Sequence, residues 1–197
     1  MTIRLPAAER RAQLVDAALA LFAAEGFQST TMDAVAAEAG VTKPVLYQHF
    51  PSKRELFLEL LRDVGRRLSE NVGAATAAAA SPREMVENGF AAYFDFVGEH
   101  PDQFRLLFGE GVRIDAEFAV EVMQVERSIA EFIAGLITIE DLGTDERLVL
   151  AHGIVGLAEG TGRHWTAAGC PGDASVLASQ VAYLAWYGLR GSAHSTR

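Results

Sequence analysis

The chain has 197 residues, half of them hydrophobic, and a formal net charge of −9, which is typical of a globular protein with a sizeable core, built either as one large domain or as a small head on a larger body. No apolar segment follows the first charged residues, and no uncharged apolar run reaches the roughly 18 residues of a membrane span, so we expect a cytoplasmic protein. A single cysteine, Cys170, excludes an internal disulfide.

The first predicted helix ends at Gly26. Its apolar residues recur at spacings of three and four and are Leu14, Val15, Ala18, Leu19 and Phe22. Arg4, Arg10 and Arg11 come before this stripe. They are candidates for phosphate contacts from an N-terminal arm, and disorder of the arm is the alternative.

A second, short helix is expected from about Thr31. Thr30 and Asp33 have the spacing of a capping box, because a threonine hydroxyl can accept the amide of residue 33. Gly40 is placed to end the helix. The residues of its expected inner face are Met32, Val35, Ala36 and Ala39.

A third helix follows after a tight turn, over about residues 43–49. Thr42 is its expected N-cap, and Pro44 fits the first turn, where a missing N–H costs nothing. Leu46 and Phe50 face inward. The residues left around the outer side are Lys43, Val45, Tyr47, Gln48 and His49. Two short helices joined at Gly40 indicate a DNA-reading helix-turn-helix.

The charge is unevenly distributed. Residues 1–55 carry six basic and six acidic side chains, so the whole net charge of −9 resides in residues 56–197. This asymmetry suits a protein that presents one end to DNA and keeps the rest repelled from it.

The remainder also has a helical pattern. Ser52 and Glu55 form a second capping box, which starts a helix at Lys53. Gly109 and Gly111 are expected to break the chain. The helices expected after residue 52 cover about residues 53–72, 82–100, 101–108, 115–139, 144–168 and 173–191. No segment alternates with a period of two, so we expect an all-α fold of about nine helices.

Two clusters in this larger part carry functional meaning. Six phenylalanines fall between residues 90 and 118, and the stretch fits either a tight core or the wall of an apolar cavity. Small residues crowd the helix over 144–168 and line the last one. Because glycine in a helix interior costs about 1 kcal/mol relative to alanine, this cluster indicates close helix packing, within one subunit or between two.

Enzymatic motifs are missing. The sequence contains no Glu-x-x-His pair of the di-iron type, no His-Glu-x-x-His and no Gly-x-Ser-x-Gly. The glycine-rich stretch over residues 156–162 follows no predicted strand, so a phosphate-binding loop is not expected. We therefore expect no catalytic residue, no metal and no cofactor.

The three predicted helices up to residue 52, called the head below, and the start of the next helix resemble the tetracycline-repressor (TetR) family. The matching residues, in the order and spacing of the family signature, are Glu25-Gly26-Phe27, Thr30-Thr31, Ala39-Gly40-Val41, Leu46-Tyr47, His49-Phe50 and Ser52-Lys53. The resemblance implies base-facing roles for Lys43, Pro44, Val45 and Gln48. It implies phosphate contacts for Thr31, Thr42, Tyr47, His49 and Lys53. Taken singly, each of the last three is equally compatible with an ordinary structural or solvated residue.

For the rest of the chain the resemblance implies an effector pocket and a homodimer. The candidate pocket residues are Phe90, Phe94, Phe104, Phe108, Phe118, Met123 and Trp165, with His152 and Arg105 as polar anchors. The candidate interface residues are Gly153, Gly156, Gly160, Leu177, Val181, Ala182, Ala185, Trp186 and Leu189. A symmetric dimer places two reading helices about one DNA turn, ~34 Å, apart.

These expectations combine into one functional hypothesis. Residues 1–52 form the DNA-binding domain, and residues 53–197 form the ligand-binding and dimerisation domain. The protein is then a repressor that binds a palindromic operator and is released when a hydrophobic or aromatic small molecule shifts the helices over 53–72 and 101–108. The alternative is a helical scaffold or partner-binding protein that has lost DNA binding.

Overall fold

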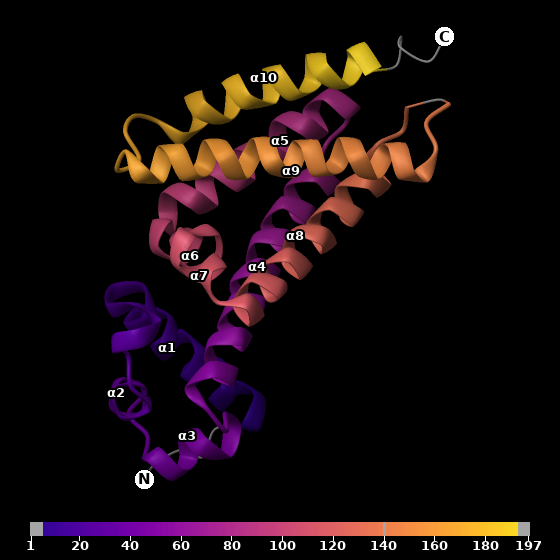
Figure 1. Ribbon diagram of the computed structural model, residues 1–197. Helices are drawn as coiled ribbons and strands as arrows, with labels where there is room; N and C mark the ends of the chain where they lie inside the picture. Colours follow the sequence, from indigo (N-terminus) through magenta and orange to yellow (C-terminus); the bar gives the residue numbers. More distant parts are fainter. Residues whose placement is uncertain (1–5, 140, 193–197) are drawn as a thin grey trace. The chain divides into compact units, whose positions relative to one another are not determined.

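The computed structural model describes residues 6–139 and 141–192, without the side chains of residues 110, 111 and 190–192. Within those ranges all regular structure is α-helical (Figure 1), which confirms the expected all-α fold. The described residues form ten helices, one more than the nine expected. The additional one is α7 (Glu110–Ile114), a short helix at the glycines that predicted a break.

The chain divides into two compact units at Val64 and Gly65, inside helix α4 (Lys53–Ala77). We expected the boundary after residue 52. The start of α4 belongs to the first unit because its apolar residues join that unit's core: Leu56 and Phe57 are buried, and the Phe57 ring lies 5.0 Å from that of Phe22.

The first unit contains α1 (Ala7–Ser29), α2 (Met32–Glu38) and α3 (Lys43–His49). All four residues of the expected inner face of α2 are buried, as are Leu46 and Phe50. Gly40, at φ +64°, makes the turn between α2 and α3, a backbone conformation that side chains other than glycine rarely adopt. The helix-turn-helix geometry predicted from the sequence is therefore present.

The cap of α2 is one residue later than predicted. Thr31 is the N-cap, and its hydroxyl accepts the Ala34 amide at 3.1 Å. Thr30 is fully buried and belongs to the end of α1, where its hydroxyl donates to the Gly26 carbonyl at 2.9 Å. Either threonine hydroxyl could cap α2, but Thr30 is buried, so Thr31 supplies the cap.

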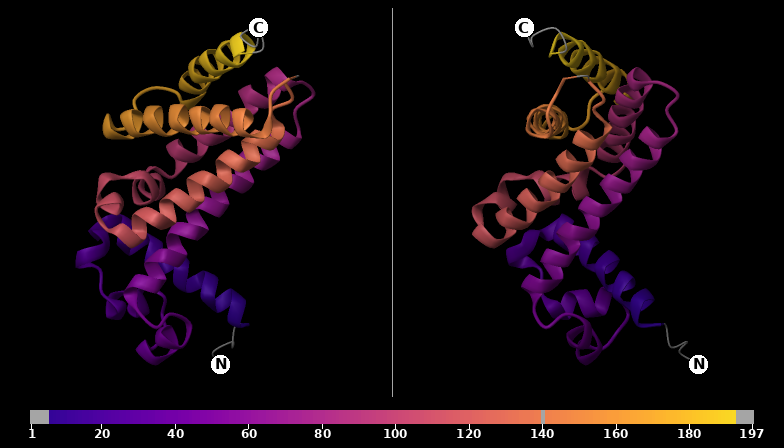
Figure 2. Two further views of the ribbon diagram at one scale, coloured as in Figure 1. Left: turned by 45° about the vertical axis from the view of Figure 1, so that its right-hand side comes forward. Right: turned by 90° about the vertical axis from the view of Figure 1, so that its right-hand side faces the viewer.

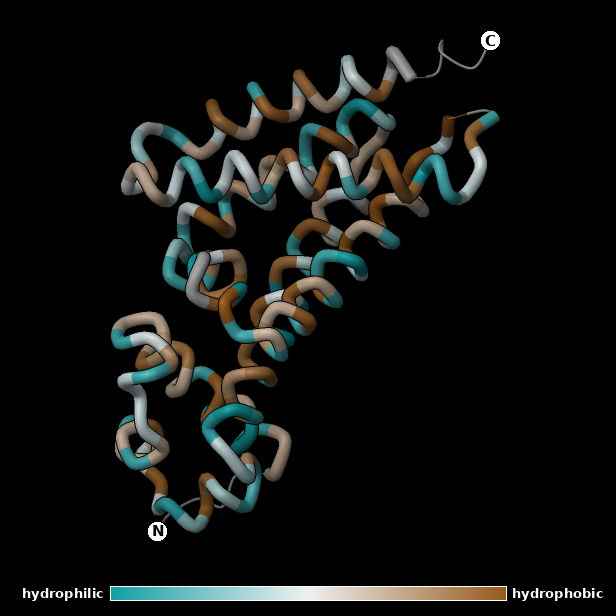
Figure 3. Tube along the Cα trace, viewed as in Figure 1, coloured by the Kyte–Doolittle hydropathy of each residue, from teal (hydrophilic) through white to brown (hydrophobic). Residues whose placement is uncertain are grey.

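The second unit contains the rest of α4 and six further helices. Besides α7 these are α5 (Pro82–Glu99), α6 (Pro101–Phe108), α8 (Ala116–Leu136), α9 (Thr144–Ala167) and α10 (Ala174–Ser192). α10 packs along α5, and α8 packs against α9 (Figures 1 and 2). Hydrophobic residues recur along α8 and α10 (Figure 3), as amphipathic helices require.

Helix length and hydropathy also bear on membrane association. In the ranges that the structure describes, no helix is both long enough and apolar enough to cross a bilayer.

Candidate nucleic-acid interface and apolar cavity

Helix α3 presents a polar surface on one side and a core contact on the other. Leu46 is fully buried, and it anchors the helix to the first unit. Lys43, Pro44 and Gln48 are exposed, while Val45 is half-buried. Three of the four expected base-facing residues are therefore exposed to solvent.

Lys43 has a partner in this structure. Its ammonium nitrogen lies 2.7 Å from Oδ1 of Asp33 on α2, and both side chains are largely exposed. This hydrogen bond, with the charge of Asp33, raises the pKa of Lys43 above its ordinary value. The lysine is therefore held as a cation beside the turn, and the Asp33 carboxylate competes with any base contact by Lys43.

The hydroxyl-bearing residues expected at phosphates, Thr31, Thr42 and Tyr47, are exposed. Tyr47 is 41% exposed, and Thr42 is the N-cap residue of α3 without using its hydroxyl as a cap. Thr31 uses its oxygen to accept the Ala34 amide, and a hydroxyl that accepts retains its proton for donation. His49 is half-buried.

Lys53, expected at a phosphate, makes its hydrogen bonds within the head in this structure. Its ammonium nitrogen donates to the carbonyl oxygens of Phe27 at 2.7 Å, Gln28 at 3.2 Å and Thr30 at 2.9 Å. It also lies 4.5 Å from the centre of the Phe27 ring. An ammonium has three protons, and all three are used to close the C-terminal end of α1. The structure thus gives Lys53 a role in holding the head together.

The arginines near the N-terminus are likewise engaged. Arg11 donates to the His49 carbonyl at 3.1 Å, pairs with Glu59 at 3.1 Å and lies over the Phe50 ring. Arg10 donates to Gln13 at 2.6 Å. Arg11 therefore ties α1 to α3 and α4, while Arg4 lies outside the described residues.

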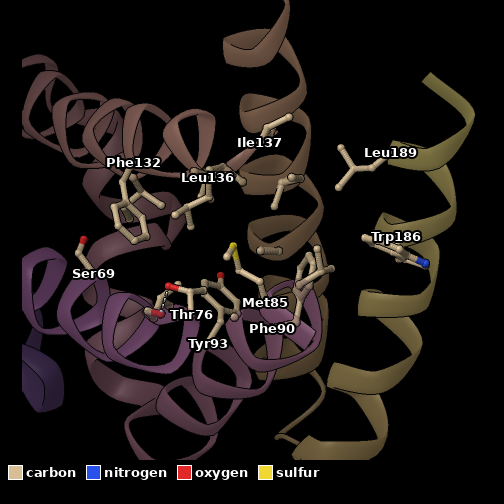
Figure 4. A pocket seen from close by; sticks show the side chains of 18 of the residues that line it. Ser69, Thr76, Met85, Phe90, Tyr93, Phe132, Leu136, Ile137, Trp186 and Leu189 are labelled. Atoms are coloured by element: carbon tan, nitrogen blue, oxygen red, sulfur yellow. Dashed lines mark hydrogen bonds between the residues drawn. The ribbon is translucent and has the colours of Figure 1, made fainter. Parts of the chain in front are cut away.

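The second unit contains a partly open cavity of about 380 Å³ with a mainly apolar wall. Figure 4 shows Phe132 and Leu136 of α8 on one side, Met85, Phe90 and Tyr93 of α5 on another, and Trp186 and Leu189 of α10 at the end. The volume lies within the range of small-molecule sites.

The cavity takes in only part of the aromatic cluster. Of the expected pocket residues, Phe90 and Phe108 line it. Phe94, Phe104, Phe118 and Trp165 are buried in a packed core beside it, with ring centres 6.2 Å apart for Phe94 and Trp165. Met123 is 54% exposed, His152 is exposed, and Arg105 pairs with Asp102 at the surface. Both interpretations of the phenylalanine cluster, as a tight core and as a cavity wall, hold in part, because one side of α5 faces the core and the other faces the cavity.

Sequence reasoning missed the polar groups at the cavity wall. Glu159 of α9 lines the cavity and is 9% exposed. Its Oε1 accepts from Arg113 at 2.6 Å and is also bonded by Arg163, while Arg113 pairs with Glu126 at 2.7 Å. Burial, and then the nearby charge of Glu159, raise the pKa of Glu126. These residues come from three different helices, so no local spacing announces them.

The expected dimer residues divide between two faces of the second unit. Gly153, Gly156 and Gly160 of α9 have open space where a side chain would stand. On α10, however, Val181, Ala182 and Ala185 are buried, Leu177 is half-buried, and Trp186 and Leu189 line the cavity. The apolar residues that α10 exposes are instead Val176, Tyr183, Leu184 and Tyr187. The expected stripe on α10 therefore packs within the subunit, against α5.

A solvent-facing α3 behind a tight turn, carried on a small helical core, defines a helix-turn-helix DNA-binding protein. The chain belongs to the TetR family of bacterial regulators. Residues 14–60 match "Bacterial regulatory proteins, tetR family", and residues 82–188 match "Tetracyclin repressor-like, C-terminal domain". It is accordingly a transcriptional regulator, as the head predicted.

Individual relatives of this chain are transcriptional regulators as well. The HTH-type transcriptional activator FasR of Mycolicibacterium smegmatis is 32% identical over 187 residues, which are 94% of this chain and 85% of that protein. A TetR-like regulator from Rhodococcus sp. RHA1 superposes with a TM-score of 0.74 at 32% identity, covering 95% of this chain and 100% of that one. The regulator FadR from Bacillus subtilis, in complex with stearoyl-CoA, shares the fold with a TM-score of 0.77 at 17% identity, over 88% of this chain and 96% of that one.

Proposed function

We propose that the chain is a cytoplasmic homodimer that binds a palindromic operator and responds to a long apolar effector. The observation that carries this proposal is the apolar cavity of the second unit, in a chain whose other unit presents a reading helix. The role of each surface can be tested separately.

The operator contacts follow from the exposure of α3. Lys43 and Gln48 contact base edges, Lys43 as a donor to guanine and Gln48 as a bidentate partner for adenine, and Pro44 and Val45 contact thymine methyl groups. Thr31, Thr42, Tyr47 and His49 hold phosphates. Since the head is neutral by formal charge, specificity and dimer spacing supply much of the affinity.

Binding to a promoter fragment in a salt series tests the DNA contacts. Gln48→Ala should weaken binding and relax preference at one base pair, by about 1–3 kcal/mol, whereas Tyr47→Phe should weaken binding to all sequences alike. Gln124→Ala, on the exposed side of α8, is the matched control. A fragment that the unaltered dimer binds no better than random DNA would favour the scaffold alternative.

The Asp33 pair gives a second test of the reading helix. Asp33→Asn removes the carboxylate that competes with DNA for Lys43 and also removes a negative charge from the head. We expect tighter operator binding, and no such gain in a Lys43→Met background. Equal gains in both backgrounds would mean that Asp33 acts by its charge alone.

For the effector we propose a long-chain fatty acyl compound. The cavity has a wall of aliphatic and aromatic side chains from α4, α5, α8, α9 and α10. The fold relative from Bacillus subtilis was crystallised with stearoyl-CoA. Palmitoyl-CoA should therefore shift operator affinity of the unaltered protein, and Val155→Trp, which fills the cavity, should abolish the shift while operator binding persists.

Whether the bound protein represses or activates transcription depends on where its operator lies in the promoter. We propose repression, released by the effector, as the first candidate. Activation is the second, because the relative from Mycolicibacterium smegmatis is an activator. Transcription from the bound promoter in a purified system, with and without palmitoyl-CoA, separates the two.

For the dimer we propose the open faces of α9 and α10. The three glycines with open space on α9 allow a neighbouring helix to approach closely. Tyr183 and Leu184 are each 61% exposed on α10, which is unusual for apolar side chains of a monomer when they adjoin one another. A helix pair with these faces is suited to packing against its own copy.

A further inference from the structure

Helix α8 packs against α4 at two glycines of α4. A Cβ on Gly65 would lie 2.5 Å from Cγ1 of Val125, so the backbone of α4 is in close contact with α8 at this point. A Cβ on Gly73, about two turns further along α4, would lie 3.7 Å from Cζ of Phe132. The Phe132 ring therefore lies between α8 and the backbone of α4.

The same ring is shared between the cavity and solvent. Phe132 lines the cavity and is nevertheless 41% exposed. Among the described residues that line the cavity, it is the only large apolar one that is exposed. Figure 4 shows it at the end of the cavity where Ser69 of α4 lies, with Trp186 and Leu189 at the opposite end. The ring thus forms the part of the wall that separates the cavity from solvent between α4 and α8.

This side chain has room to rotate. It meets α4 at a residue without a side chain, and Gly135, on the next turn of α8, has open space where a Cβ would stand. Exposed side chains change rotamer within picoseconds to nanoseconds, without a change in the backbone. Rotation of Phe132 toward solvent therefore opens the cavity between α4 and α8 while both helices stay in place.

The interior of the cavity does not suit the charged end of a ligand. Glu159, which is 9% exposed, is the only charged residue among the described residues of the wall. An anionic group carried inside would lose its hydration and would face a group of like charge. A ligand with an apolar chain and an anionic end is therefore accommodated with its chain inside and its charged end at the opening.

We propose that the effector enters chain first between α4 and α8, through an opening made by rotation of the Phe132 ring, and that its polar end stays at this opening. The proposal rests on the proposed function of the cavity as an acyl-chain site and adds the route and the direction of binding. Phe132 sets the rate at which the effector exchanges.

The test measures association and dissociation separately. The probe is cis-parinaric acid, a fatty acid whose fluorescence rises in apolar surroundings, and it is mixed with the full chain in a stopped-flow instrument. Because a gate is a barrier in both directions, Phe132→Ala should raise both rate constants about five- to tenfold, which corresponds to a barrier lower by about 1–1.4 kcal/mol. Phe132→Trp, with a larger ring, should lower both rate constants.

Two controls distinguish a gate from ordinary wall. Met85→Ala removes a contact with the chain on the α5 side of the cavity, so it should raise the dissociation rate constant and leave association within about twofold. Thr138→Trp places a large ring at another exposed residue of the wall, just after the end of α8. It should leave both rate constants within about twofold, because the chain does not pass there.

Phe132→Lys tests where the polar end lies. A cation at the opening should tighten binding of the acid about two- to fivefold relative to Phe132→Ala, as an exposed ion pair does, and should not tighten binding of its methyl ester. An equal effect on acid and ester would refute the proposed direction of binding.

The remaining outcomes concern the route. A faster dissociation alone in Phe132→Ala would make Phe132 an ordinary wall residue. Slower association in Thr138→Trp, with no change in the Phe132 variants, would place the opening at Thr138. Both results would refute the entrance while the acyl-chain site remained, whereas a full chain that bound neither cis-parinaric acid nor palmitoyl-CoA would also overturn the proposed function.

Discussion

The role of Lys53 gives the sharpest prediction about the head. The chain contains two lysines, Lys43 and Lys53, and family resemblance would put both at DNA. Replacing Lys53 by methionine keeps a stem of similar length and removes the ammonium. Three carbonyls at the end of α1 then lose their donor, at 2.7, 3.2 and 2.9 Å.

The magnitude follows from those contacts. A hydrogen bond from a charged donor contributes about 1.5–3 kcal/mol, but these three share one ammonium and are partly reached by water. A single cation resting on the Phe27 ring adds about 0.5–1 kcal/mol. Allowing for non-additivity, we expect Lys53→Met to lower the free energy of unfolding of the head by about 2–3 kcal/mol.

Native-state hydrogen exchange at the amides of α2 and α3 measures this loss locally, and urea unfolding measures it globally. Lys53→Arg, which keeps a charged donor, should lose much less. Lys43→Met should leave unfolding unchanged, because its pair with Asp33 is exposed, and should weaken operator binding. If Lys53→Met unfolded like the unaltered protein and lost only DNA affinity, Lys53 would be a phosphate contact after all.

Three further predictions concern the second unit. Gly162→Ala should lower the free energy of unfolding by about 1–3 kcal/mol, because the new Cβ would lie 2.9 Å from a Phe104 ring carbon. Gly135→Ala has open space and should raise it by up to about 1 kcal/mol. Thermal melts compare the two variants, and equal melting temperatures would contradict the close packing at Gly162. The raised pKa of Glu126 means that the folded state binds its proton more tightly, so the free energy of unfolding should fall as pH rises above 4.5. Urea titrations over a pH series should show a shallower fall in Glu126→Gln. Equal pH dependence in both proteins would refute the raised pKa. Leu184→Glu should give a monomer in light scattering, whereas Val120→Glu, equally a charge on an exposed apolar site, should not; an unchanged oligomer in both would place the interface elsewhere.

The head was predictable because its information is local. Apolar spacing of three and four, a glycine at the turn and the caps at Thr42 and Ser52 fix each helix within a few residues. The contacts that local patterns could not show there are tertiary. Thr30 lost the cap to Thr31 because it is buried under α1, and Lys53 reaches back over more than twenty residues to carbonyls that no local pattern marks.

The second unit was less predictable for a physical reason. An apolar stripe has the same spacing whether it faces a filled core or a cavity, so Phe90 and Phe94, one turn apart, were assigned alike although only Phe90 lines the cavity. On α10 two apolar stripes run side by side, and only the packing of α5 decides which one is covered.

Helix α10 separates the cavity from the proposed partner subunit. One side of the helix, at Trp186 and Leu189, forms cavity wall, and the adjoining side, at Tyr183 and Tyr187, is exposed with the two rings 4.4 Å apart. A ligand that displaces the first side changes the surface that the second side offers. By thermodynamic reciprocity, any such effect of the effector on dimer affinity is matched by an equal effect of dimerisation on effector affinity. Effector sensitivity would then depend on the concentration of the regulator itself, so that the level at which a cell keeps this protein becomes part of the signal it reads.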